Sequence, residues 1–145
     1  MKVVRFTMIA SSYLMLVRDR KILLSRRYQT GYEDGKYSLP AGHVEDGESL
    51  MDCMAREVVE EIGVILAPQA FSLVHVMHQK HLDIRMDFFF VADVGDQKPV
   101  IREPEKCDDL RWFPLNNLPA NTIPYIRHAI ECYQKKIFYS EFGWK

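Results

Sequence analysis

The sequence predicts an α/β fold in which a mixed β-sheet lies between two helices. Three observations lead to this prediction. β-rich runs alternate with two segments of helical periodicity, which is typical of a sheet covered on both faces. The chain of 145 residues is 48% hydrophobic and 27% charged, the balance of a folded domain with a buried core. No internal repeat or flexible linker divides it, so residues 1–145 are expected to form one domain.

The N-terminal third is expected to consist of strands and a loop. Residues 5–17 and 21–26 are β-rich runs on either side of a charged turn at 18–20, which predicts a hairpin. Residues 28–36 carry two glycines and are expected to form a loop. A short strand at 37–39 should stop at the proline that follows it.

The rest of the chain adds the two helices and three more strands. Helical periodicity predicts one helix at 49–62, ended by Gly63, and an amphipathic helix at 123–138. Strands are expected at 70–78, 84–93 and 108–113. The aromatic tail at 138–144 is expected to dock either on its own domain or on a second subunit, so a homodimer is a candidate assembly.

The charge balance argues against bulk nucleic acid as a partner. Lys and Arg number 19, Asp and Glu number 20, and the net charge is -1. Such a chain has no overall positive field that would hold a polyanion non-specifically. A phosphate-rich ligand would therefore need local cationic groups or a bound metal ion.

The cysteines and the N-terminal segment bear on location. Cys53, Cys107 and Cys132 form no C-x-x-C pair or zinc pattern, which favours free thiols in a reducing compartment. The apolar run near the N-terminus is interrupted at 11–13 and is shorter than the roughly 20 residues that cross a bilayer. We therefore expect a cytoplasmic protein without membrane contact.

The helix at 49–62 carries a cluster of acidic residues on one side. Glu57, Glu60 and Glu61 stand at i, i+3 and i+4, and the apolar positions fall on the opposite side. Three neighbouring carboxylates repel one another unless solvent or a cation relieves them. A solvated acidic face is one interpretation. A site for Mg²⁺, which prefers oxygen ligands, is the other.

The residues around this cluster favour the metal site. The positions that matter are Gly42, Glu48, Arg56, Glu57, Val58, Glu60, Glu61, Gly63 and Val64. Together they match the pattern G-x5-E-x7-R-E-U-x-E-E-x-G-U, in which U is aliphatic. Chance agreement at a given start is on the order of one in 10⁹. The segment resembles the Nudix box of small MutT-like Nudix hydrolases.

This resemblance implies an α/β/α sandwich and a metal site. By analogy with the family, Glu57, Glu60 and Glu61 hold Mg²⁺, with Mn²⁺ as a substitute, and a main-chain carbonyl of Ala41 faces the ion. Gly42 lets the backbone turn closely at that point. The ion would neutralise phosphate charge and lower the pKa of a bound water.

The resemblance also implies catalytic roles. Glu48 is expected to pair with Arg56 and hold the motif in shape, and Glu61 belongs to the reacting centre. Glu57 matches the residue assigned as the base in MutT-like members. Glu105, in a late segment that resembles those members, is a candidate for an extra ligand or base. The alternative for Glu105 is a surface loop.

Substrate contacts are expected from residues outside the box. Arg26 and Arg27 end a strand near the box, where a guanidinium can pair with phosphate. Tyr37 belongs to an aromatic-rich segment suited to stacking on a base. His75 and His78 are candidates for phosphate contact, although the favoured interpretation is that they occupy exposed strand positions. Because they point to opposite faces of a strand, they do not converge on one zinc ion.

The expected reaction is cleavage of a diphosphate bond in a nucleotide-like small molecule. A nucleoside triphosphate, giving a monophosphate and pyrophosphate, is the first candidate. Nucleotide sugars and RNA 5′ ends are alternatives, as is an inactive nucleotide-sensing or protein-binding module. The later proline typical of ADP-ribose-cleaving members is absent between Pro68 and Pro99, and so is the S-Q-P-W-P-F-P array of NADH-cleaving members. Those two substrates therefore rank lower.

Overall fold

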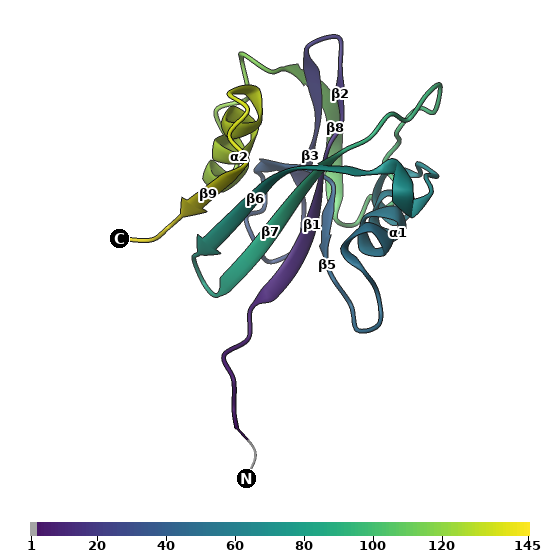
Figure 1. Ribbon diagram of the computed structural model, residues 1–145. Helices are drawn as coiled ribbons and strands as arrows, with labels where there is room; N and C mark the ends of the chain where they lie inside the picture. The colour runs from purple at the N-terminus through teal and green to yellow at the C-terminus, as the bar shows by residue number, and fades with distance from the viewer. Residues whose placement is uncertain (1–2) are drawn as a thin grey trace.

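The structure, a computed structural model, describes residues 3–145 and has two β-sheets flanked by helices (Figure 1). Its strands are β1 (Ile9–Met15), β2 (Val17–Arg18), β3 (Lys21–Arg27), β4 (Tyr37–Ser38), β5 (Ala41–His43), β6 (Ser72–Lys80), β7 (Ile84–Val91), β8 (Cys107–Pro114) and β9 (Tyr139–Phe142). The helices are α1 (Leu50–Ile62), α2 (Pro124–Gln134) and a 3-10 turn at Pro68–Ala70. The predicted α/β fold with a mixed sheet and two helices is confirmed.

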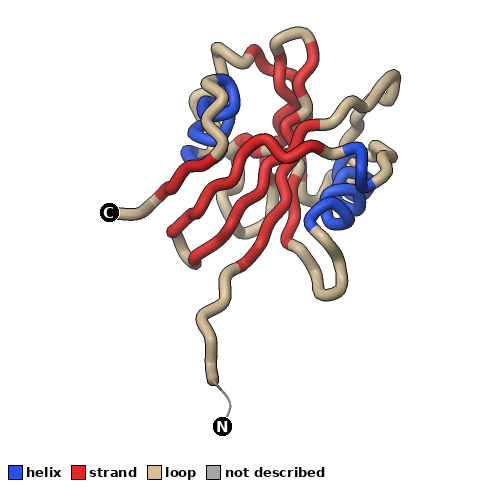
Figure 2. Tube along the Cα trace, in the orientation of Figure 1, coloured by secondary structure: helices blue, strands red, loops and turns tan. Residues whose placement is uncertain are grey.

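The larger sheet is mixed and has the strand order β5-β1-β7-β6-β9. β1 runs parallel to β7 and β6 runs parallel to β9, whereas the β1–β5 and β6–β7 pairs are antiparallel. Helix α1 lies towards the β5 edge and α2 towards the β9 edge, as the blue helices beside the red strands in Figure 2 show.

The smaller sheet is antiparallel and centres on β3, which pairs with β2, β4 and β8. The predicted hairpin at 18–20 joins β2 to β3 through Asp19 and Arg20, which both have positive φ angles of 52° and 62°. The pairing of β3 with β8 over its whole length brings residues 107–114 back beside residues 21–27. This sheet forms a second wall of the functional cavity described below.

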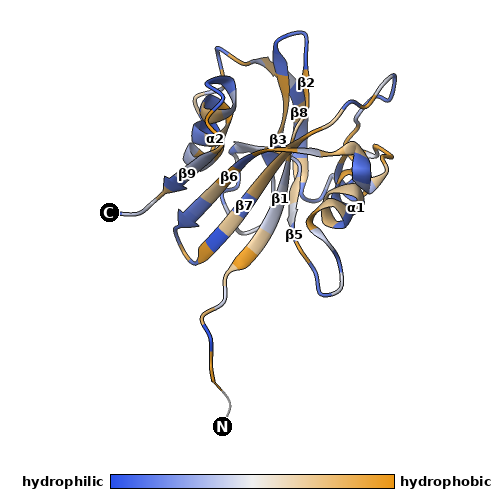
Figure 3. Cartoon of the chain, in the orientation of Figure 1, coloured by the Kyte–Doolittle hydropathy of each residue, from blue (hydrophilic) through white to orange (hydrophobic). Residues whose placement is uncertain are grey.

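The core is divided between the two faces of β1, since alternate residues of a strand point to opposite sides. Tyr13 and Met15 belong to a buried cluster that includes residues of α2, and Leu14 and Leu16 belong to one that includes residues of α1. Both helices carry hydrophilic and hydrophobic stretches side by side (Figure 3), as expected for helices with one buried face.

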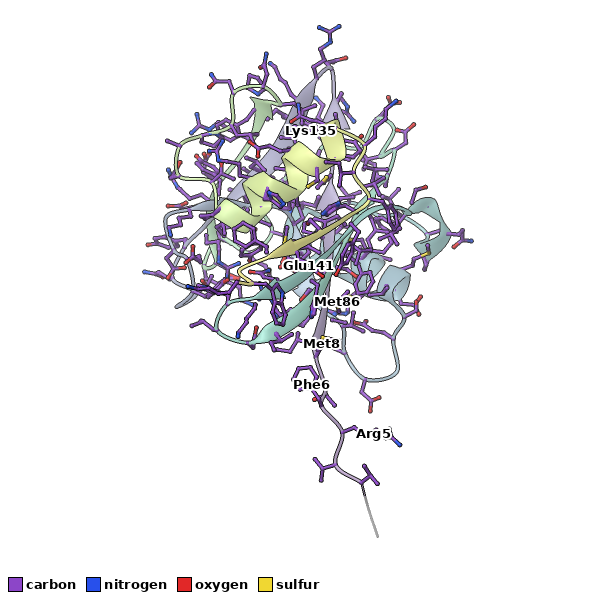
Figure 4. The ribbon with its side chains drawn as sticks, turned by 60° about the vertical axis from the view of Figure 1, so that its left-hand side comes forward. Arg5, Phe6, Met8, Met86, Lys135 and Glu141 are labelled. Atoms are coloured by element: carbon purple, nitrogen blue, oxygen red, sulfur yellow. The ribbon has the colours of Figure 1, made fainter. Side chains whose placement is uncertain are left out.

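The predicted strand at 5–17 is too long at its N-terminal end. The first ladder position of β1 is Ile9, opposite Arg85 of β7, and the preceding residues lie outside the strand. Val4 and Phe6 are 94% and 70% exposed. In Figure 4 the labelled residues Arg5, Phe6 and Met8 follow a segment that leads away from the body of the protein. The apolar composition of residues 3–8 therefore does not reflect burial in this chain.

The C-terminal helix is shorter than predicted. It ends at Gln134, and Lys136 adopts a left-handed conformation with φ 60° that turns the chain. Residues 139–142, which lie beyond the end of the expected helix, form the edge strand β9. The aromatic tail thus docks on its own domain, one of its two expected positions. The homodimer stays a prediction.

His75 holds this C-terminal strand in place from a fully buried position. One ring nitrogen lies 2.8 Å from the carbonyl oxygen of Ile137 and the other 2.8 Å from the hydroxyl of Ser140. Burial lowers the pKa of His75 from its ordinary value of 6.5. As the pH falls below 6.5, the unfolded chain takes up this proton more readily than the folded one, so His75 removes stability at acidic pH.

We expect His75→Leu to lower the free energy of unfolding at pH 7.5 by about 1 kcal/mol, because it removes the hydrogen bonds of the Ile137 carbonyl and the Ser140 hydroxyl, which are only partly buried. The difference from the wild type should shrink at pH 5.5, where the wild type loses the contribution of neutral His75. Urea denaturation at both pH values measures this difference in the free energy of unfolding. The exposed His81, changed to Leu, serves as the control. An equal pH dependence in wild type and His75→Leu would contradict the assignment.

Candidate active site

A cavity of about 760 Å³ opens between the two sheets, next to α1. Its walls come from β1, β3, β5 and α1, from the turn between β6 and β7, from the segment before β8, and from Tyr125 of α2. Cavities of roughly 300–1,000 Å³ are usual for small-molecule ligands. Segments that are more than 100 residues apart in the chain, such as Ser11 and Tyr125, therefore meet around one volume.

Helix α1 is capped at both ends, and it presents its acidic side to the cavity because its apolar side is buried against the sheet. The hydroxyl of Ser49 accepts from the backbone N–H of Asp52 at 3.1 Å, and the Asp52 carboxylate accepts from the N–H of Ser49 at 3.3 Å. Gly63, at φ 69°, ends the helix as predicted. The buried face consists of Cys53, Met54, Val58 and Ile62, whereas Met51, which the helical period predicts to be buried, is 37% exposed.

The backbone of β5 passes directly over the helix at Gly42. A Cβ atom at this position would overlap the carboxyl group of Glu57, so any other residue would displace that carboxylate. The neighbouring Ala41 donates its N–H to Oε1 of Glu61 at 2.9 Å. This contact involves the amide of Ala41, and the predicted role of its carbonyl oxygen stays a prediction.

Arg56 is the centre of a network of carboxylates. Its Nε and Nη2 atoms donate to both oxygens of Glu48 at 3.0 and 2.7 Å, which confirms the predicted pair. Its Nη1 atom lies 2.7 Å from Oε1 of Glu57 and 3.3 Å from Oε1 of Glu60. The hydrogen bonds from Arg56 lower the pKa of Glu48 to about 2. One guanidinium therefore neutralises part of the charge of three box carboxylates.

Glu57 and Glu61 are held where ionisation is costly. Burial raises the pKa of Glu57, and the guanidinium of Arg56 opposes that shift. Burial raises the pKa of Glu61 well above its usual value, and the charges of Glu57 and Glu103 raise it further. Two carboxyl groups in such an arrangement favour either a shared proton or a bound cation.

The donor atoms at this point suit a hard divalent cation. Glu57, Glu61 and Glu103 all line the cavity and offer only oxygen, the ligand type of Mg²⁺. Within residues 3–145, no group of three or more His, Cys, Asp or Glu side chains is arranged around one point as metal ligands. Arg56 and the Ala41 amide engage the Glu57 and Glu61 carboxylates instead. A metal site here requires those carboxylates to turn from these partners.

Cationic side chains line the wall of the cavity opposite the helix. Arg26 and Arg27 come from the end of β3, and Lys106 comes from the segment before β8. Nε of Arg26 lies 2.7 Å from the carboxylate of Asp108, and Nε of Arg27 donates to the carbonyl of Tyr32 at 2.6 Å. The structure thus brings both predicted arginines to the cavity.

Three predicted substrate contacts lie outside this cavity. Tyr37 is buried, and its hydroxyl binds the carboxylate of Asp109. His75 is buried against the C-terminal strand, with both ring nitrogens engaged. The ring of His78 packs on Trp144 at 4.6 Å between centroids. The physical reason is the same in each case: the strand directs the side chain into the core or towards the tail.

Glu105 does not line the cavity, and Glu103 takes its place. Glu105 is exposed, whereas Glu103 faces the box and contributes to the raised pKa of Glu61. Sequence analysis also missed Arg85 and Tyr125, both of which line the cavity. Arg85 could have been found from the pattern of its strand, because it and Asp87 are the two charged residues of an otherwise apolar run.

The cavity as a whole can bind a polyphosphate between acidic and basic walls. Box carboxylates on one side can hold a divalent cation, and the arginines and lysine on the other can contact phosphate oxygens. None of the helices in residues 3–145 has the length and apolar character needed to cross a membrane.

The family model described as NUDIX domain matches residues 8–131 of this chain. Among curated proteins, the chain is 34% identical over 110 residues to an NAD-capped RNA hydrolase NudC from Stutzerimonas stutzeri (strain A1501), covering 76% of this chain and 38% of that protein. It is 32% identical over 108 residues to an ADP-ribose pyrophosphatase from Methanocaldococcus jannaschii, covering 72% and 61%. The chain therefore spans less than half the length of the NudC relative.

Two solved structures match over nearly all of their own length. A MutT NUDIX hydrolase from Burkholderia pseudomallei aligns with a TM-score of 0.78 at 27% identity, covering 87% of this chain and 98% of that one. A MutT protein from Methanosarcina mazei Go1 also reaches a TM-score of 0.78, at 21% identity, covering 92% and 98%. The second likeness shows the fold alone.

Proposed function

The chain belongs to the NUDIX domain family, and on that premise we propose that it is a Mg²⁺-dependent pyrophosphohydrolase of nucleoside diphosphate-linked compounds. The observation that supports this most is the pair of half-buried carboxyl groups, Glu57 and Glu61, at one wall of the cavity. A protein that only bound nucleotides would have no use for acidic groups that are costly to ionise there.

Glu57, Glu60 and Glu61 would hold the ion. Bound there, Mg²⁺ would neutralise phosphate charge and lower the pKa of a ligated water. Glu57 would exchange its 2.7 Å contact with Arg56 for the ion, while Glu48 keeps Arg56 at the edge of the site. The raised pKa of Glu57 brings it closer to the working pH, as a general base requires.

The first candidate substrate is a nucleoside triphosphate, cleaved to a monophosphate and pyrophosphate. Arg26, Arg27 and Lys106 supply three cationic groups on the opposite wall, which suits a chain of several phosphates. ADP-ribose and NAD-type compounds are the second candidates, because relatives of this chain carry those names. The sequence markers of these subgroups are absent here, so the triphosphate keeps first place.

Phosphate and pyrophosphate release from a nucleotide panel tests the proposal. The panel contains triphosphates, nucleotide sugars, ADP-ribose, NAD, dinucleoside polyphosphates and a 5′-triphosphate RNA. We expect turnover of one class with Mg²⁺ or Mn²⁺ and none after chelation with EDTA. A folded protein that binds a nucleotide and turns over no member of the panel would instead be a sensing or protein-binding module.

A further inference from the structure

Buried polar atoms without a partner in the protein gather at one end of the cavity. Among residues 3–145, the buried side-chain atoms in this condition are Ser11 Oγ, His78 Nε2, Gln79 Oε1, Arg85 Nη2 and Asp87 Oδ1. All except His78 Nε2 belong to one cluster. Buried polar groups in folded proteins nearly always have a partner, so such a cluster calls for an explanation.

The register of the mixed sheet places these residues side by side. Ser11 of β1 is opposite Asp87 of β7, and Arg85 of β7 is opposite Gln79 of β6. Residues directly across from each other share a face, and Arg85 and Asp87, two positions apart in a strand, share it too. Ser11 and Arg85 also line the cavity. The cluster therefore forms the floor of the cavity at this end.

Arg85 is the member that faces the cavity with a free donor. Its side chain is only 9% exposed, and its Nε atom lies 3.7 Å from Oδ1 of Asp87 and 3.8 Å from Oδ1 of Asp83. Its Nη2 atom has no acceptor in the protein. A buried donor left unpaired destabilises the protein, so a ligand that supplies the acceptor gains affinity.

The guanidinium of Arg85 lies over one of three tyrosines that contact one another. Its central carbon lies 5.4 Å from the centroid of the Tyr125 ring, and the Tyr125 hydroxyl lies 3.5 Å from that of Tyr32. Tyr13 meets Tyr125 edge to face, with 6.4 Å between centroids. All three tyrosines line the cavity. Tyr13 and Tyr125 are buried, so the half-buried Tyr32 is the ring that a flat heterocycle can contact, beside the directed hydrogen-bond donor of Arg85.

The local charge argues against a phosphate at this end. Arg85 is accompanied by the carboxylates of Asp83 and Asp87, so the group carries no net positive charge. Arg26, Arg27 and Lys106, on the other wall, place three cations together, although Arg26 is paired with Asp108 and Lys106 lies 3.8 Å from Glu103. A neutral acceptor, such as a carbonyl oxygen of a base, suits Arg85 better than an anion does.

The distance from the acidic residues also suits a base. Ala41, which contacts Glu61, is on β5, and Arg85 is on β7, with β1 between them. Two strand spacings separate those strands, or about 10 Å. A nucleotide whose phosphates lie at the box can extend its base towards Arg85 within one cavity.

We infer that the Arg85 end of the cavity is the nucleobase subsite and that it selects bases presenting a carbonyl oxygen, such as guanine, hypoxanthine or uracil, over adenine. This inference rests on the proposed function, since it assigns the base of the same substrate. Arg85 supplies the donor to the carbonyl oxygen, Ser11 lines the cavity at the same end, and Tyr32 provides the aromatic surface. Asp87 positions Arg85 through the contact with its Nε atom, and Gln79 holds Asp87 by donating to its other carboxylate oxygen.

The test compares kcat/KM for GTP and ATP in the wild type, Arg85→Gln and the control Arg18→Gln, which changes an arginine outside the cavity. We expect the wild type to prefer GTP by about tenfold or more, the discrimination usual for an arginine that reads a guanine edge. Arg85→Gln should lose the preference through a fall in the GTP value. Arg18→Gln should keep it.

Tripolyphosphate, which has no base, separates base recognition from phosphate recognition. Its inhibition constant should be the same in wild type and Arg85→Gln. Weaker inhibition of the variant, or an equal loss for GTP and ATP, would overturn the inference, as would the absence of a GTP preference in the wild type. Arg85→Lys, which keeps the charge and loses the planar fork, replaces Arg85→Gln if that variant does not fold.

Binding of GMP and AMP, measured by calorimetry, decides the subsite independently of turnover. Tighter binding of GMP that is lost in Arg85→Gln supports the subsite even if no nucleotide of the panel is hydrolysed. Equal binding of GMP and AMP overturns it even if hydrolysis is found. The failure of the inference and the failure of the proposed function are therefore distinguishable.

Discussion

Replacement of Glu61 by glutamine is expected to lower kcat by a factor on the order of 10² to 10⁴ while the protein stays folded. The amide keeps the size of the side chain and can still accept the hydrogen bond from the Ala41 N–H. It removes the negative charge with which Glu61 would hold a cation beside Glu57. Initial rates with the best substrate of the panel, at saturating Mg²⁺, measure the loss.

The same substitution is expected to stabilise the protein in metal-free buffer. Because the folded pKa of Glu61 is raised above its unfolded value, the unfolded chain loses this proton first as the pH rises. The wild type therefore loses stability as the pH rises through the interval between those two values, and Glu61→Gln does not. Mg²⁺ should raise the Tm of the wild type and leave that of the variant nearly unchanged.

Glu131→Gln is the matched control, since Glu131 is exposed on α2 and outside the cavity. It should change neither the rate nor the Mg²⁺ response. Wild-type turnover in Glu61→Gln would remove Glu61 from the reacting centre. A Tm of that variant that still rises with Mg²⁺ would place the ion elsewhere.

Replacement of Arg56 by glutamine is expected to lower the free energy of unfolding by about 2–3 kcal/mol in metal-free buffer. Arg56 is one quarter exposed, which reduces its effect below that of a fully buried partner. Its loss leaves Glu48, Glu57 and Glu60 without a common cation. For a chain of this size, the change corresponds to a fall in Tm of very roughly 5–10 °C.

Mg²⁺ should restore part of the stability lost in Arg56→Gln, because a divalent ion can replace the missing positive charge. Na⁺ at equal ionic strength should not. Thermal melts with each salt measure the difference, and Arg5→Gln, an exposed change in the N-terminal segment, is the control. If both ions restored the variant equally, the effect would be general screening and not occupation of a site.

The box and its helix could be predicted from the sequence because their interactions are local. The ends of α1 and the pair of Glu48 with Arg56 depend on residues a few positions apart, and spacing alone describes them. Glu103 was missed in favour of Glu105 because the segment before β8 is irregular. Without a period, spacing does not tell which side chain faces the cavity.

The tertiary parts of the site could not be predicted in the same way. Tyr37 and His75 looked available because polar and aromatic residues in strands are often exposed, but pairing of their strands buried both. The tail after Gln134 looked helical because apolar residues continue the period to Ile137. Residues 139–142 instead pair with β6, which lies more than 60 residues earlier in the chain. A local sequence pattern cannot predict a contact between residues so far apart.

The parallel pairing of β1 with β7 also bears on how quickly this protein can assemble. Ile9 meets Arg85, so the chain must close a loop of more than 70 residues before the central strands join. Helix α1 needs no such closure and can form within about a microsecond. Topologies that depend on distant pairings fold in milliseconds to seconds. Because Ser11 of β1 and Arg85 of β7 both line the cavity, its walls can be complete only after this distant pairing has formed.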